Sequence, residues 1–236
     1  MLSLYTFTAP PSACGYLPGR DWRLRYEVVG ALTAAEYESR LLSGWRRFGF
    51  SLFVPRCPAC VACQSLRVDV ARFTPSDSQK RSWKRNAGAV TVSVGEPGVT
   101  QEKLALYDAF HAHQADAVGW PDRGPESAAD YAAAFVENPF PAEEWLYHLD
   151  GRLVGVGYVD PLSVGPSAVY FFHDPAERKR SLGTFNVLCV IDRARRDGLP
   201  HAYLGLYVAG CRSLEYKANY RPHEVLVGGA WAAGGA

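Results

Sequence analysis

The chain has 236 residues, of which 48% are hydrophobic and 21% are charged, and this composition supplies a core and excludes a disordered protein. Its formal net charge of +1 excludes a polycation, so any binding to nucleic acid must come from a local basic patch. Because no secretory signal and no apolar run of about 18 residues stands out, we expect a soluble, cytoplasmic protein with no membrane or DNA partner.

Helices and extended segments are predicted to alternate along the first half of the chain. The helix over residues 33–47 has the clearest start, since Thr33 can cap it and Glu36 occupies the capping-box position. Apolar residues then recur at helical spacing, and Gly49 is expected to end the helix. The other elements expected here are extended segments at 1–30, a strand at 50–55, a half-buried strand at 66–70, a basic helix start at 76–86, and a strand and loop at 87–99.

The second half of the chain has a hairpin as its most specific local signal. Asp150-Gly151 lies between two apolar runs, 145–149 and 152–158, and favours a type I′ turn. The glycine- and alanine-rich end, 228–236, is expected to be frayed. The remaining predicted elements are helices at 100–118, 127–137, 181–196 and 211–219, and strands at 169–172, 202–206 and 225–227.

This order of elements predicts an α+β fold in which a mixed sheet is flanked by helices. It is similar to the order found in N-acetyltransferase-like (GNAT) folds. We expect an N-terminal, cysteine-containing domain at residues 1–86 and a GNAT-like catalytic domain at residues 87–230.

Three of the six cysteines form the run Cys57-Pro-Ala-Cys60-Val-Ala-Cys63. This C-x2-C-x2-C spacing lets thiolates converge from a tight turn, as zinc sites and iron–sulfur clusters require. Cys14 is the candidate for a fourth ligand. The sequence does not decide between zinc and an iron–sulfur cluster, and the alternative is a set of reduced, buried cysteines. Cys189 and Cys211 are interpreted as structural.

A basic turn, Arg178-Lys179-Arg180-Ser181-Leu182-Gly183, leads into the helix predicted at 181–196. N-acetyltransferase-like folds carry a glycine-containing loop here, whose backbone N–H groups and helix dipole hold the pyrophosphate of coenzyme A. Ser181 stands at the first glycine position, and its Cβ argues against coenzyme A while leaving an anion site possible. The alternative is a solvated run of charges.

A second basic segment covers residues 79–86, with Trp83 among four cations. Cations that contact phosphates and an aromatic ring that stacks on an unpaired base are the chemistry of an RNA-binding surface. The alternative is an exposed basic helix face with Trp83 in the core.

Several longer motifs cover nearly the whole chain and are specific when taken together. They are Cys14-Gly-Tyr-Leu-Pro, Arg56-Cys57-Pro-Ala-Cys60-Val-Ala-Cys63-Gln-Ser-Leu-Arg67, Ser78-Gln-Lys-Arg81, Ala168-Val-Tyr-Phe-Phe-His-Asp-Pro175, Ser181-Leu-Gly-Thr-Phe-Asn186, Tyr203-Leu-Gly205 and Tyr216-Lys-Ala-Asn-Tyr-Arg-Pro222. With these motifs the chain resembles the aminoacyl-tRNA–protein transferases of the N-degron pathway, both arginyltransferases and bacterial leucyltransferases.

The resemblance implies transfer of an amino acid from a charged tRNA to proteins with an N-terminal Asp or Glu, which marks them for degradation. The length and the C-x2-C-x2-C form are more like the leucyltransferase branch, so leucyl-tRNA is the expected donor and arginyl-tRNA the alternative. Leu206 and Ser213-Leu214 depart from the family pattern near the expected cleft and leave the donor open.

The implied reaction is attack of a neutral α-amine on an activated ester, which requires no cofactor and no covalent enzyme intermediate. A weak base suffices, because an α-amine has a pKa of about 8. The candidate catalytic residues, on or beside the central strands, are His173, Asp174, Tyr170 and Tyr203.

The acidic acceptor needs a cation, and the candidates for its site are Arg67, Lys217 and Tyr216, with surface ion pairs as the alternative. The candidates for tRNA binding are Lys80, Arg81, Lys84, Arg85, Arg178, Lys179, Arg180, Ser181 and Gly183. Two other functions stay open: an N-acetyltransferase that binds coenzyme A, and a metal-stabilised RNA-binding or redox-sensing module without transferase activity.

Overall fold

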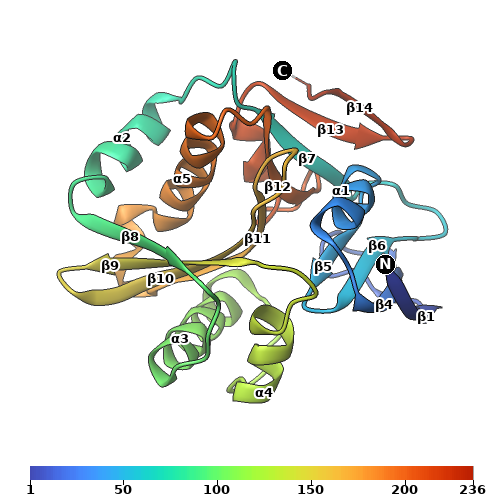
Figure 1. The fold of residues 1–236 in the computed structure, drawn as a ribbon. Coiled ribbons are helices and arrows are strands. Elements are labelled where there is room, and N and C mark those ends of the chain that lie inside the picture. Colours follow the sequence, from blue (N-terminus) through green and yellow to red (C-terminus); the bar gives the residue numbers. More distant parts are fainter. Residues whose placement is uncertain (236) are drawn as a thin grey trace.

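Eight strands form the larger sheet of the computed structural model, which describes residues 1–235 (Figure 1). From edge to edge their order is β14, β13, β7, β12, β11, β10, β9 and β8. Neighbouring strands are antiparallel except β11 and β12, which are parallel. The strands are β7 (Gln64–Asp69), β8 (Val90–Gly95), β9 (Glu143–Leu149), β10 (Arg152–Asp160), β11 (Ser167–His173), β12 (His201–Tyr207), β13 (His223–Val227) and β14 (Ala230–Ala233).

Helices cover both faces of this sheet, which explains why β10 is buried from its second residue to its last. On one face α5 (Leu182–Arg196) packs into the main core, with α2 (Asp77–Asn86) outside it (Figure 1). On the other face lie α3 (Gln101–Val118) and α4 (Ala128–Tyr131), which the π-helical turn η1 (Ala132–Val136) continues. Within the described residues, no helix combines the length and hydropathy needed to cross a membrane.

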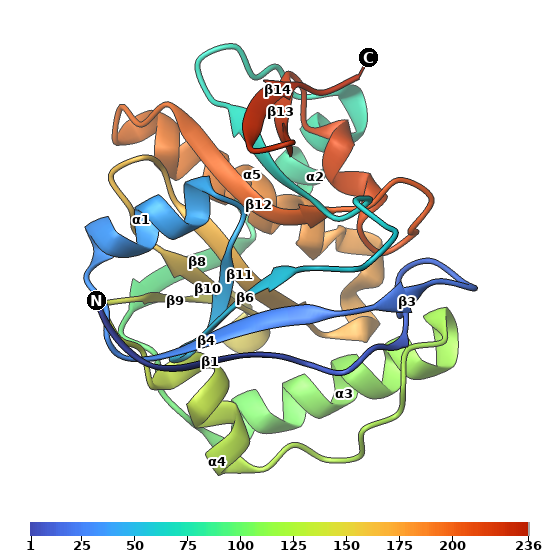
Figure 2. The ribbon, with the colours of Figure 1, turned by 90° about the vertical axis from the view of Figure 1, so that its right-hand side faces the viewer.

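A smaller sheet of four strands, in the order β1, β4, β6 and β5, forms from the residues before the cysteine run. The helix α1 (Ala34–Leu42) packs on it, and the capping box predicted at Thr33 and Glu36 is present. Figure 2 shows β1 at the outer edge of this sheet, beside β4. The strands are β1 (Leu2–Thr8), β4 (Leu24–Ala31), β5 (Arg46–Phe48) and β6 (Ser51–Pro55), and β2 (Ser12–Ala13) pairs separately with β3 (Asp21–Trp22).

The two sheets share a core and a buried ion pair. Tyr203 of β12 packs in the same apolar cluster as Leu52 of β6. Arg47 of β5 donates from Nε to Asp160 Oδ2 of β10 at 3.2 Å, and its Nη2 pairs with the other carboxylate oxygen. Burial of a guanidinium requires such a partner, so this contact fixes β5 against the large sheet.

The parallel strands β11 and β12 share a single pair of facing residues, Ser167 and Tyr203. Along β12 the pairing with β7 shifts register between Tyr203 and Gly205, which marks a bulge. Gly205 has φ +84°, a conformation that side chains with a Cβ rarely adopt. The backbone of β12 is therefore irregular just beyond its contact with β11.

Three expectations from the sequence need correction. The helix predicted at 33–47 ends at Leu42, because Gly44 turns the chain with φ +89° and frees residues 46–48 to form β5. The helix predicted at 211–219 is a short 3-10 helix, η3 (Glu215–Asn219), and another, η2 (Pro175–Arg180), precedes α5. The end predicted to fray, 228–236, forms β14, with residue 236 outside the described residues.

The sheets divide the chain at a different place from the predicted domains. The predicted division between 1–86 and 87–230 does not separate the two sheets, because β7 lies between β13 and β12 in the large sheet. The chain passes from the small sheet to the large one through the cysteine run at 57–63. Pairing across the sheet therefore places the structural division before β7.

Candidate functional site

His173 and Asp174, predicted as catalytic, lie at the end of β11. His173 Nδ1 is 3.2 Å from the Asp174 carbonyl oxygen, which can only accept, so Nδ1 carries the proton and Nε2 is the basic nitrogen. Burial lowers the pKa of His173, which favours the neutral ring. Asp174 caps η2 by accepting from Ala176 N at 2.8 Å and pairs with Arg152, so its carboxylate is already engaged.

Tyr170, the third catalytic candidate, faces α3. Its hydroxyl is 2.8 Å from His111 Nε2, and His111 Nδ1 is 2.8 Å from the Tyr107 carbonyl oxygen. Because the carbonyl can only accept, Nδ1 carries the proton and donates to it. Nε2 is then the acceptor, and the Tyr170 hydroxyl donates to it. Burial raises the pKa of Tyr170 and lowers that of His111, so both are neutral near pH 7. No motif in the sequence marks His111, because α3 is far from β11 along the chain.

Tyr203 and Arg67, a catalytic and an acceptor-binding candidate, contact each other on β12 and β7. Arg67 donates from Nη1 to the Tyr203 hydroxyl at 3.3 Å. The same guanidinium pairs with Glu224 of β13 at 2.6 Å and lies 4.3 Å from the centre of the Trp231 ring. The charge of Arg67 is therefore compensated within the protein.

Lys217 and Tyr216, the other acceptor candidates, lie on η3. Lys217 donates from Nζ to the Leu206 carbonyl of β12 at 2.7 Å. Burial, followed by the nearby Arg46 charge, lowers the pKa of Lys217 to about 7. Tyr216 is 42% exposed, so η3 links the interior beside β12 to the surface.

The predicted tRNA-binding residues come together as one surface. Ser82 of α2 donates from Oγ to the Ser181 carbonyl at 3.2 Å, and Asn86 donates from Nδ2 to the Arg180 carbonyl at 2.8 Å. These bonds join the end of α2 to η2 and the start of α5. We call the cations gathered here the basic surface: Lys80, Arg81, Lys84, Arg85, Arg178, Lys179 and Arg180.

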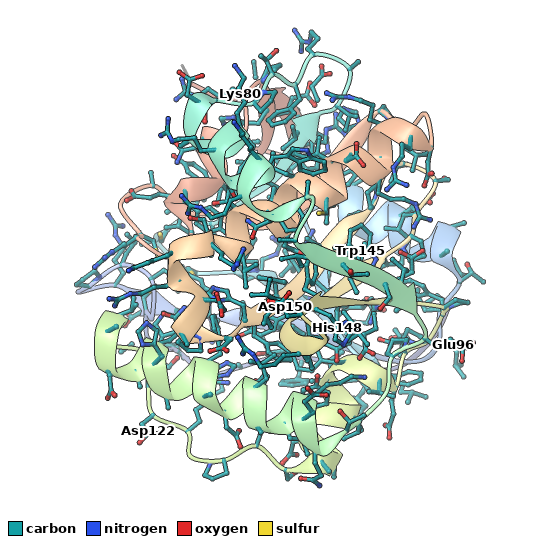
Figure 3. The ribbon with its side chains drawn as sticks, turned by 90° about the vertical axis from the view of Figure 1, so that its left-hand side faces the viewer. Lys80, Glu96, Asp122, Trp145, His148 and Asp150 are labelled. Carbon is teal, nitrogen blue, oxygen red and sulfur yellow. The ribbon has the colours of Figure 1, made fainter. Side chains whose placement is uncertain are left out.

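Most of the basic surface is uncompensated. Lys80 pairs weakly with Asp77 at 3.4 Å, and Arg180 pairs with Glu177 at 3.1 Å. Across residues 1–235, the other five cations of this surface make no ion pair. Figure 3 shows Lys80 on α2, with α5 between α2 and α3.

The first turn of α5 opens onto this surface. Ser181 precedes it in a left-handed conformation, with φ +56°, at the position where N-acetyltransferase-like loops have a glycine. No described side chain caps α5, so the N–H groups of its first turn are left to donate to a ligand. A Cβ at Gly183 would meet no atom within 4 Å, so the backbone there is open. These features suit an anion.

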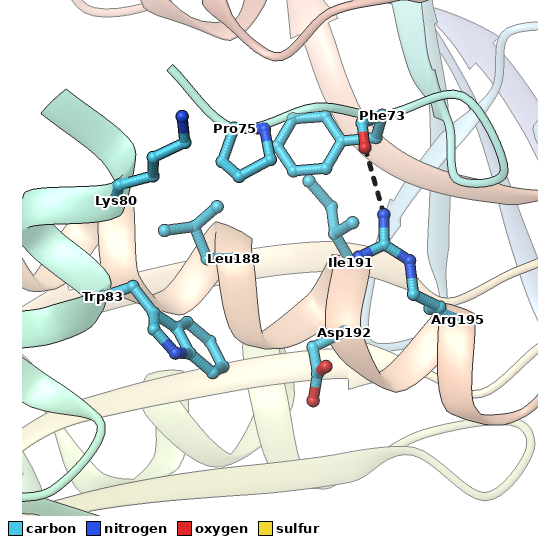
Figure 4. Close-up of a pocket in the computed structure, with 8 residues that line it drawn as sticks. All are labelled: Phe73, Pro75, Lys80, Trp83, Leu188, Ile191, Asp192 and Arg195. Atoms are coloured by element: carbon cyan, nitrogen blue, oxygen red, sulfur yellow. Dashed lines mark hydrogen bonds between the residues drawn. The ribbon is translucent and has the colours of Figure 1, made fainter. Parts of the chain in front are cut away.

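A pocket of about 340 Å³ lies beside the basic surface, between α2 and α5 (Figure 4). Lys80 and Trp83 come from α2, and Leu188 and Asp192 from α5. Trp83 is 38% exposed and packs 5.5 Å from the Phe185 ring, measured between centroids. The ring is therefore partly core and partly open to the pocket, and stacking of Trp83 on an unpaired base stays a prediction.

Cys14, Cys57, Cys60 and Cys63, the predicted metal ligands, lie near one another, since the pKa of Cys63 rises to about 12 through burial and through the other three thiols. Cys14 Sγ accepts from the N–H groups of Tyr16 and Leu17, each at 3.4 Å. Within the described residues, however, no three such side chains are arranged to hold a metal ion. The geometry does not fit a bound metal, and zinc or an iron–sulfur cluster stays a prediction that metal analysis can test.

Comparison with known proteins defines the class. Residues 12–81 match the N-terminal part of the arginine-tRNA-protein transferase family, and residues 102–227 match its C-terminal part. The chain belongs to this family of aminoacyltransferases, as its motifs led us to expect.

Individual relatives match over almost their full length. An aspartate/glutamate leucyltransferase from Chromobacterium violaceum is 33% identical, over 97% of this chain and 93% of the relative. Another from Halorhodospira halophila is 38% identical, over 93% of each.

A solved structure supports the fold alone. A domain described as the C-terminal domain of a lysylphosphatidylglycerol synthetase, from Agrobacterium fabrum, aligns with a TM-score of 0.50 at 15% identity, over 73% of this chain and 58% of that one. The predicted mixed α+β sheet with flanking helices is confirmed.

Proposed function

We propose that the protein transfers leucine from leucyl-tRNA to the N-terminal Asp or Glu of acceptor proteins. The observation that carries this proposal is the near full-length similarity to aspartate/glutamate leucyltransferases, at 33% and 38% identity. The basic surface supports it, because an RNA substrate needs uncompensated cations on one face. Arginyl-tRNA is the alternative donor.

The large sheet in this proposal is a GNAT-like catalytic unit. The reaction takes place where β11 and β12 diverge beyond their one pair of facing residues, Ser167 and Tyr203. The free α-amine of the acceptor attacks the ester carbonyl of the aminoacyl-tRNA, the new amide bond forms, and the tRNA hydroxyl leaves with a proton. His173, neutral and with Nε2 free of the Asp174 carbonyl, is our candidate to accept the proton of the amine. Tyr170, bonded to His111, and Tyr203, buried and bonded to Arg67, are our further candidates to orient the reactants.

The tRNA lies in this proposal on the basic surface, with a phosphate at the first turn of α5. Ser181 and Gly183 contribute backbone N–H groups there, and the cations of α2 and η2 contact neighbouring phosphates. This arrangement separates the site of tRNA binding from the site of chemistry.

The test is transfer of radiolabelled leucine from leucyl-tRNA to a peptide that begins with Asp, with arginyl-tRNA in a parallel reaction. We expect transfer of leucine, and transfer of arginine alone would move the protein to the other branch. Absence of transfer from both tRNAs would contradict the proposal. A calorimetric titration with acetyl-coenzyme A, for which we expect no heat, tests the N-acetyltransferase alternative.

A further inference from the structure

Arg46, the residue before Arg47 on β5, is a buried cation that is only partly satisfied. Its side chain is 6% exposed. From Nη2 it donates to Ser167 Oγ at 3.3 Å and to the Ala168 carbonyl at 3.1 Å, both at the start of β11. Its Nη1 is buried with no partner in the described part of the chain. A buried N–H group without an acceptor costs free energy unless a ligand completes it.

Gly205 lets Lys217 approach the same point. A Cβ on Gly205 would stand 3.3 Å from Arg46 Nη2 and 3.5 Å from Lys217 Nζ. The bare backbone of the β12 bulge therefore separates two cationic groups, one from β5 and one from η3. We call Arg46 and Lys217 the inner cation pair.

The carboxylates of β10 and β13 are already used by other arginines. Asp160 is held by Arg47, and Glu224 by Arg67. No ion pair within residues 1–235 includes Arg46 or Lys217. Two like charges, one buried at Arg46 and one half-buried at Lys217, are unfavourable side by side until an anion joins them.

We propose that the inner cation pair binds the side-chain carboxylate of the acceptor's N-terminal Asp or Glu. This inference rests on the proposed function, and it moves the acceptor site from Arg67, whose charge is compensated, to Arg46. One carboxylate oxygen accepts from Arg46 Nη1 and the other from Lys217 Nζ, a geometry that a planar guanidinium beside an ammonium favours. The point of contact between β11 and β12, Ser167 with Tyr203, lies next to the inner cation pair, so a carboxylate held there sits beside the central strands of the large sheet.

The test compares two peptides that differ only in their first residue, Asp or its neutral isostere Asn. Binding to the enzyme without tRNA is measured by calorimetry, and kcat and KM are measured with leucyl-tRNA. In the wild type we expect Asp to be preferred by roughly 30-fold or more, the range for a buried charge and its partner. In Arg46→Met and Lys217→Met this preference should fall below about threefold, through the KM for the Asp peptide, while the KM for leucyl-tRNA stays the same.

Arg195→Met is the matched control, because Arg195 also donates from one nitrogen to two oxygens, the carbonyls of Val70 and Phe73, at 3.3 and 3.1 Å. Its preference for Asp should equal that of the wild type. Arg46→Lys, which keeps a charge, replaces Arg46→Met if Arg46→Met does not fold. Its preference for Asp over Asn should lie between that of the wild type and that expected of Arg46→Met.

The outcomes separate the two proposals. If the wild type prefers the Asp peptide in binding and the variants do not, the inference stands even if no leucine is transferred, and only the proposed function fails. Equal binding of Asp and Asn by the wild type overturns the inference, as does an unchanged preference in both variants. A raised KM for leucyl-tRNA instead of the peptide would assign the pair to a tRNA phosphate and overturn it too.

Discussion

The basic surface and the inner cation pair carry the same kind of charge in opposite surroundings. Six of the seven cations of the basic surface are exposed side chains on α2 and η2, where water and salt screen them. Arg46 is 6% exposed, and Lys217 lies under the same bulge of β12. A screened surface tolerates many phosphate positions, whereas a buried pair accepts one anion of one shape. The first kind of site gives affinity and the second gives selectivity.

Arg46 and Arg47 sharpen this contrast, because they are neighbours on one strand. Successive residues of a strand point to opposite faces, so one guanidinium meets Asp160 and the other meets β11. Arg47, which pairs with an acid, stabilises the fold. Arg46, which has no acidic partner in the described chain, is available to bind a ligand.

The largest expected effect concerns the buried pair of Arg47. Asp160→Asn leaves that guanidinium without its counter-charge, and we expect the free energy of unfolding to fall by about 3–5 kcal/mol in urea denaturation. Asp77→Asn, which removes an exposed partner of Lys80, should cost less than about 1 kcal/mol. Equal and small losses of unfolding free energy in both variants would show that the buried and the exposed cation depend on their partners to the same extent.

The pH dependence of stability should report the half-buried Lys217. Its pKa is lowered from 10.5 to about 7, so as the pH rises from 7 to 9 the unfolded chain binds up to one proton more than the folded protein. Stability should therefore rise with pH there, by at most about 1.4 kcal/mol per unit from this group. Lys217→Met should lose that rise, measured as the difference in unfolding free energy from the wild type. If unfolding free energy varies with pH in the same way in the wild type and in Lys217→Met, Lys217 is solvated. If the wild-type rise becomes shallower in the presence of the Asp peptide, carboxylate binding is supported.

The smallest expected effect is on tRNA binding. Replacing Arg178 and Lys179 with Ala should weaken leucyl-tRNA binding and lower the slope of log K against log salt by roughly 0.7–0.9 per lost phosphate contact. The preference for Asp over Asn should not change. Arg196→Ala, at the far end of α5 and paired with Asp192, is the control and should leave the slope as it is. A changed preference for Asp over Asn in the double variant would show that the basic surface and the acceptor site are not separate.

Local sequence signals predicted the elements well where one turn or cap determined them. The Thr33 capping box and the Asp150-Gly151 hairpin both formed as expected. The basic segments at 79–86 and 178–183 were found as separate signals, and only the fold shows that Ser82 and Asn86 join them.

Contacts between distant residues could not be predicted from the sequence. Arg46 fell inside a helix expected at 33–47, and the turn at Gly44 was not recognised as its end. Its contacts with Ser167 and Ala168 span 121 and 122 residues, and no periodicity encodes them. Arginine suits a carboxylate, which makes Arg67 a candidate from the sequence, but Glu224, which neutralises it, lies 157 residues away.

The three-residue strand β5 has a consequence for how this chain can be divided. It belongs to the small sheet, yet its two arginines complete the large one, at Asp160 and beside Gly205. A fragment that begins at β7 would keep the basic surface and His173 but would lack the residue that we expect to select acidic N-termini. We therefore expect the choice of acceptor to need both parts of the chain, Arg46 from the part before β7 and Lys217 from the part after it.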